Sequence, residues 1–165
     1  MDQLSEEYFE EHAVQVARVV FAASLLDDSV TTFIAEFLDL EEYQENALLR
    51  PMQSRAKIDL LQRLTNHYVG GDTAKAMAKL CKEATSALQD RNAIVHGVST
   101  EIDGKLGFRS WVGKAKLTGK PEEWPVERVC QLAFKIIDLT DAIDALVDGF
   151  RDLKAKSLEG HAAND

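Results

Sequence analysis

Apolar residues recur every three to four positions over long stretches of this chain, which is the period of an α-helix with one buried face. Four stretches carry this period: residues 5–38, 52–68, 72–96 and 126–156. The first is either one long helix or two helices broken near Asp27-Asp28-Ser29. Amphipathic helices of this length bury their apolar faces against one another. The pattern therefore predicts an all-α fold, an antiparallel bundle of four to five helices.

The segments between these stretches are marked by proline, by glycine and by a change of period. Pro51 keeps the residue before it out of the helical conformation, so a connection is expected within residues 40–51. Residues 98–118 alternate between apolar and polar positions and contain Asp103-Gly104, a typical two-residue hairpin turn. One short β-hairpin is therefore expected between the last two long helices.

The length and composition fit one soluble domain. The chain has 165 residues, of which 45% are hydrophobic and 28% charged. We expect a single helical domain over residues 1–160 and a frayed tail at residues 161–165. The N-terminus is acidic, unlike a signal peptide, and the longest apolar stretch, residues 13–26, is too short to span a bilayer. These features predict a cytoplasmic protein with no membrane partner.

The two cysteines indicate a reducing environment. Cys81 and Cys130 each lie at an apolar position of a predicted helix, so two buried thiols are expected, with a structural disulfide as the alternative. No Cys-x-x-Cys pair is present, which excludes a zinc ribbon or a thioredoxin-type motif.

Charge is unevenly distributed along the chain. The net charge is −9, which argues against broad nucleic-acid binding. Residues 1–47 carry −11, residues 48–135 carry +6 and residues 136–165 carry −4. A polyanion could therefore bind the middle segment, provided that the fold keeps this segment apart from the acidic ends.

No cofactor and no metal are expected. The segment from Gly113 to Lys120 fails as a phosphate-binding loop because Pro121 follows where Ser or Thr must bind magnesium. Asp27-Asp28 is interpreted as a capping or turn feature. Four acids of the last helix form one row: Asp138, Asp141, Asp144 and Asp148. The favoured interpretation is a hydrated outer face, and the alternative is a set of ligands for a hard cation.

The most informative polar residues are Arg91, Asn92 and His96, on a helix otherwise suited to burial. Asn92 and His96 are four residues apart and share one helix face, and the long Arg91 side chain can reach round the helix. An imidazole with a pKa near 6.5 can accept the proton of a 2′-hydroxyl or protonate a leaving oxygen. A guanidinium can bind the scissile phosphate. Two such sets related by a two-fold axis could cleave RNA without a metal.

The run from Arg91 to Gly97, Arg-Asn-Ala-Ile-Val-His-Gly, resembles the motif of the HEPN superfamily, the nucleotide-binding helical domains of prokaryotes and higher eukaryotes. That motif is an arginine separated from a histidine by four to six residues, often with a polar residue after the arginine. The segment Arg55–Leu61 also resembles one common in members of this size. Val98 stands where members paired with a nucleotidyltransferase antitoxin have tyrosine, which disfavours that system.

The resemblance implies a homodimer with the motifs facing each other across the dimer cleft. It further implies a metal-independent endoribonuclease of a toxin–antitoxin or other defence system, with RNA as substrate and an antitoxin or another protein as partner. Arg91 and His96 would be catalytic, and Asn92 would support them.

Two alternatives remain. In one, Arg91 pairs with Asp90 or with a neighbouring helix, and His96 only caps the helix C-terminus. In the other, the chain is a non-catalytic helical module that binds a protein partner or a nucleotide, and its acidic first helix favours a basic partner.

Overall fold

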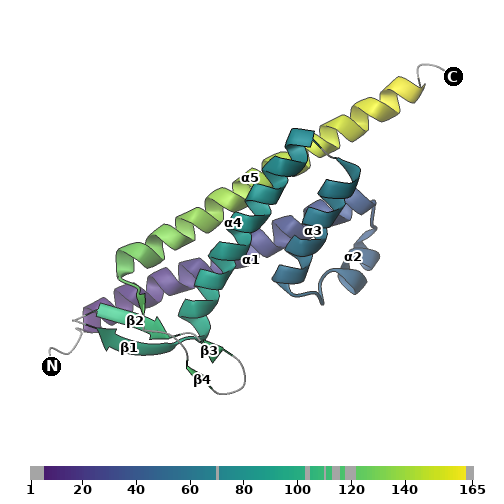
Figure 1. Ribbon diagram of the computed structural model, residues 1–165. Coiled ribbons are helices and arrows are strands. Elements are labelled where there is room, and N and C mark those ends of the chain that lie inside the picture. Colours follow the sequence, from purple (N-terminus) through teal and green to yellow (C-terminus); the bar gives the residue numbers. More distant parts are fainter. Residues whose placement is uncertain are drawn as a thin grey trace. The chain divides into compact units, whose positions relative to one another are not determined.

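The computed structural model describes residues 6–69, 71–102, 105–109, 111–112, 116–117 and 122–162, and the side chains of residues 6–69, 71–97, 102, 105–107 and 122–152. Helices dominate this part of the chain, which confirms the predicted helical-bundle class (Figure 1). The helices are α1 (Glu6–Leu38), α2 (Glu42–Leu48), α3 (Ser54–Tyr68), α4 (Gly71–His96) and α5 (Val126–Ala162). Among the described residues, none of these helices combines the length and the apolar character needed to cross a bilayer.

The predicted hairpin is present directly after α4. Strands β1 (Val98–Ile102) and β2 (Lys105–Arg109) pair antiparallel, with Ile102 opposite Lys105, so that two residues connect them. The turn residues Asp103-Gly104 lie outside the described residues. Strand β5 (Glu122–Glu123) adds to the free side of β2, and two further short strands, β3 (Trp111–Val112) and β4 (Lys116–Leu117), pair with each other.

The structure settles the helix boundaries that the sequence pattern left open. Helix α1 is continuous, so Asp27 and Asp28 lie inside a helix and are neither caps nor turn residues. The flanking Leu26 and Val30 are buried, and this packing outweighs the small intrinsic preference of aspartate for helix ends. Helix α2 lies within the expected connection, and α5 continues beyond its expected end near residue 156.

The described chain divides into two compact units, and the division falls inside α1, α4 and α5. Unit 1 comprises Met1–Leu25 and Glu83–Ile137, and its fully buried core residues include Val19, Ala84, Ala87, Val129 and Ile136. Unit 2 comprises Leu26–Lys82 and Asp138–Asp165, and its core residues include Leu26, Ile34, Leu61, Met77 and Ile143.

Candidate functional site

The C-terminal end of α4, in unit 1, carries the three motif residues side by side. Arg91 Nη1 donates a hydrogen bond to Asn92 Oδ1 at 2.9 Å and lies 3.4 Å from His96 Nε2. Asn92 and His96 are exposed, and Arg91 is half-buried. A guanidinium and an imidazole this close together can both reach one phosphate group that approaches the helix end from solvent.

Arg91 retains an unused hydrogen-bond donor. Its Nε atom is buried and has no hydrogen-bond partner among the described residues. Such a donor costs about 1–3 kcal/mol when it is left unpaired. Asn92 therefore fixes Arg91 Nη1, whereas the buried Nε has no partner among the described residues.

Asp90, next to Arg91 in the chain, does not pair with it. No ion pair joins these two described residues, so the Asp90 part of the first alternative is wrong. Burial raises the pKa of the Asp90 carboxyl, while Lys135 and Arg128 of α5 partly oppose this shift by attraction and Glu122 adds to it by repulsion. Arg91 instead contacts Asn92 and His96.

A buried tryptophan connects the strands to the helices of unit 1. Trp124 is 2% exposed; its backbone N–H donates to Leu106 O at 2.8 Å, and its backbone carbonyl accepts a hydrogen bond from His12 Nε2 at 2.9 Å. The Arg128 guanidinium lies 3.8 Å from the centre of the Trp124 ring. The start of α1, strand β2 and the start of α5 therefore meet at one residue.

Arg128 also connects strand β5 to α5. Its Nη1 donates to the Glu123 carbonyl at 2.6 Å, and its Nη2 pairs with Glu122 Oε1 at 2.7 Å. Sequence reasoning missed the contacts of Arg128 and the role of His12. His12 and Trp124 are 112 residues apart in the chain, so no local pattern relates them.

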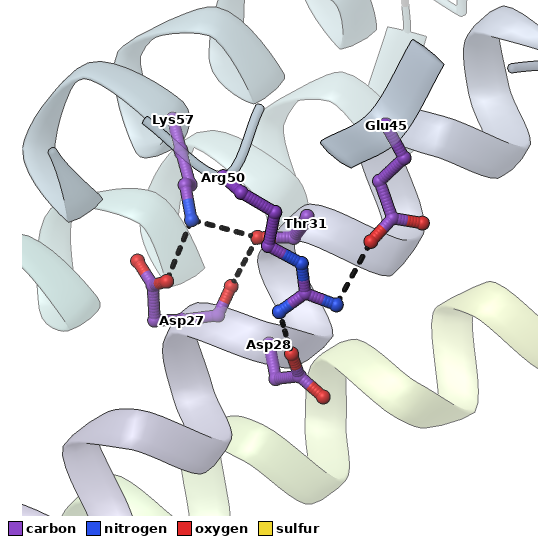
Figure 2. A network of polar contacts seen from close by, with 6 residues as sticks. All are labelled: Asp27, Asp28, Thr31, Glu45, Arg50 and Lys57. Carbon is purple, nitrogen blue, oxygen red and sulfur yellow. Dashed lines mark hydrogen bonds and ion pairs between the residues drawn. The ribbon is translucent and has the colours of Figure 1, made fainter. Parts of the chain in front are cut away.

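The acids of α1 that were expected at a helix end belong instead to two ion pairs in unit 2 (Figure 2). Lys57, which is 1% exposed, places Nζ 2.6 Å from Asp27 Oδ2 and 2.9 Å from Thr31 Oγ1. Thr31 in turn donates to the Asp27 carbonyl at 2.7 Å. Arg50 bridges Asp28 and Glu45 at the surface. These contacts bind α3 and the α2–α3 connection to α1, which is a structural role.

The remaining candidate groups show no catalytic arrangement. Among the described residues, no group of three or more His, Cys, Asp or Glu side chains could hold a metal ion. The four aspartates in a row on α5 are all exposed. Both cysteines are free, which excludes the disulfide alternative, and burial, with a smaller effect of Asp59, raises the pKa of the Cys81 thiol to about 11.

Comparisons with known proteins give no assignment: no family model, no curated protein and no solved structure matches the chain.

Proposed function

We propose that this protein is a cytoplasmic, homodimeric endoribonuclease that cleaves RNA without a metal, and that Arg91 and His96 carry the chemistry. The observation behind the proposal is the approach of Arg91 Nη1 to within 3.4 Å of His96 Nε2 at an exposed helix end. The resemblance of this motif to that of the HEPN superfamily supports the same activity.

The roles follow from the chemistry of each group. His96 accepts the proton of a ribose 2′-hydroxyl, and the 2′-oxygen then attacks the adjacent phosphorus. The 5′-oxygen leaves with a proton, so the products are a 2′,3′-cyclic phosphate and a 5′-hydroxyl. Arg91 binds the non-bridging phosphate oxygens and stabilises the additional negative charge of the transition state. Asn92 is a positioning residue, because its Oδ1 fixes Arg91 Nη1.

The reaction needs an acid as well as a base, and one His96 cannot act as both in a single step. A second copy of the chain, related by a two-fold axis, supplies the second imidazole and a second guanidinium. The middle segment of the chain, residues 48–135, has a net charge of +6 that favours RNA, but unit 1, which holds the motif, also contains the acidic residues 1–25, which oppose it. As a toxin or defence enzyme, the dimer would be inhibited by an antitoxin or another protein partner.

The test is cleavage of a fluorescent single-stranded RNA in excess EDTA. The wild type cuts the RNA; His96→Ala lowers the rate by about 10²–10⁴-fold and Arg91→Ala by about 10²–10³-fold. His67→Ala, which removes an exposed histidine of α3 in the other unit, leaves the rate unchanged and is the matched control. Equal rates for the wild type and His96→Ala would refute the proposal.

A further inference from the structure

Two helices of unit 1 expose large apolar side chains on the sides turned away from the core. On α1 these are Phe9, Val14, Phe21 and Leu25, with Phe21 67% exposed; on α5 they are Phe134 and Ile137, with Phe134 59% exposed. Phe9 lies on another side of α1, about 140° from Val14. The other five residues are called the apolar face. The buried residues of the same helices, such as Val19 and Val129, lie on other sides.

The spacing aligns these side chains along each helix. Val14, Phe21 and Leu25 lie within about 40° of one another around α1, because each residue advances by about 100°. Phe134 and Ile137 are three residues apart and are neighbours on α5. The hydrogen bond from His12 to the Trp124 carbonyl joins α1 to the start of α5. Surface helices normally place polar residues on their outer side, so exposed aromatic residues on both helices indicate a binding surface.

The charged neighbours of the apolar face are mainly acidic. Glu7 precedes Val14 by seven residues and Glu127 precedes Phe134 by seven, so each stripe begins at an exposed carboxylate two turns earlier. Glu10 and Glu11 are exposed at the same end of α1. Arg18 and Lys135 are the exposed bases of these two helices in unit 1, and Arg18 donates to Gln15 Oε1 at 3.3 Å.

We infer that the apolar face binds a basic amphipathic helix of a partner protein. Such a helix matches both features, with apolar side chains for Phe21 and Phe134 and lysines or arginines for the carboxylates. A second copy of this chain fits less well, because its own net charge is −9 and the carboxylates favour a basic partner. The surface uses α1 and α5, not the α4 end that carries Arg91 and His96, so the inference does not depend on the proposed nuclease activity.

The experiment uses a fluorescein-labelled synthetic helix of leucine and lysine, about five turns long, whose leucines lie on one face. Its binding to the full-length protein is followed by fluorescence anisotropy. One control peptide has the same composition in a scrambled order, and another has glutamate in place of lysine. The variants are Phe21→Ser/Phe134→Ser and Glu7→Gln/Glu10→Gln; the matched control is Tyr43→Ser, which alters a residue of unit 2 that is 66% exposed.

The wild type and Tyr43→Ser bind the amphipathic lysine peptide at least tenfold more tightly than either control peptide. Phe21→Ser/Phe134→Ser weakens this binding at least tenfold. In Glu7→Gln/Glu10→Gln the affinity for the peptide falls less steeply than in the wild type as NaCl is raised to about 1 M, where the Debye length is about 3 Å. Equal binding by the wild type and the serine variant overturns the inference. Loss of the dimer in the serine variant, measured by sedimentation, also overturns the inference, because the apolar face would then lie between two copies of this chain.

Discussion

Replacement of Lys57 by methionine tests the buried ion pair of unit 2. The Lys57 side chain is 2% exposed, and methionine keeps most of its volume while removing the charge and both hydrogen bonds. The Asp27 carboxylate would then lose its partner at Oδ2, and its Oδ1 is already buried without one among the described residues. Breaking a buried pair typically costs about 3–5 kcal/mol. Because the Asp27 side chain is 27% exposed and water can reach part of it, we expect a loss of about 3 kcal/mol.

The matched control lies in the same network (Figure 2). Arg50 pairs with Asp28 at the surface, where the two side chains are 48% and 57% exposed, so Arg50→Met should cost at most about 1 kcal/mol. The free energy of unfolding is measured by urea denaturation followed by circular dichroism. The double variant Lys57→Met/Asp27→Leu should recover much of the loss, because no charge then remains unpaired. Equal losses for Lys57→Met and Arg50→Met, or no recovery in the double variant, would refute the reasoning.

Three further predictions concern unit 1 and the two thiols. In the native protein at pH 8, iodoacetamide should modify the half-buried Cys130 but not Cys81, whose pKa is raised to about 11 and which is buried; mass spectrometry of the labelled peptides checks this. Burial raises the pKa of Asp90, so its stabilising contribution is present at low pH and is lost as the pH rises through the raised pKa. The free energy of unfolding of Asp90→Asn relative to the wild type should therefore increase as the pH rises from below about 3.9 to neutrality. Urea titrations that show the same difference between the two proteins at every pH would contradict this prediction. Gly107→Ala should destabilise the protein by about 1–3 kcal/mol, because the new Cβ would collide with Ile102 Cδ1 and lie 3.0 Å from the Glu122 carbonyl oxygen; an unchanged thermal midpoint would contradict it.

The long helices could be predicted because each buries one face. The period of buried residues along α1, such as Val19, Ala22 and Leu26, repeats the apolar period of the sequence. Four short elements escaped prediction for a physical reason. Helix α2 has seven residues and none of them is buried, and β3, β4 and β5 have two residues each, so none of the four leaves a periodic signal. The continuity of α1 depends on packing, which a local pattern containing two aspartates does not reveal.

The candidate site could be predicted only in part. The spacing of Asn92 and His96 placed them on one helix face, and both are exposed there. The approach of Arg91 to His96 depends on the conformation of a long side chain that reaches round the helix, which spacing alone does not determine. The contacts of Trp124 with His12 and Leu106 join distant segments, and only the folded chain reveals them.

The most direct test of the proposed nuclease is the chemistry of its products. The wild type and His96→Ala, purified in parallel, are incubated with a defined single-stranded RNA in excess EDTA, and the ends of the fragments are identified by mass spectrometry. We predict a 2′,3′-cyclic phosphate on the upstream fragment and a 5′-hydroxyl on the downstream fragment with the wild type, and almost no fragments with His96→Ala. Intact RNA with the wild type, fragments ending in a 3′-hydroxyl and a 5′-phosphate, or equal cleavage by both proteins would contradict the account.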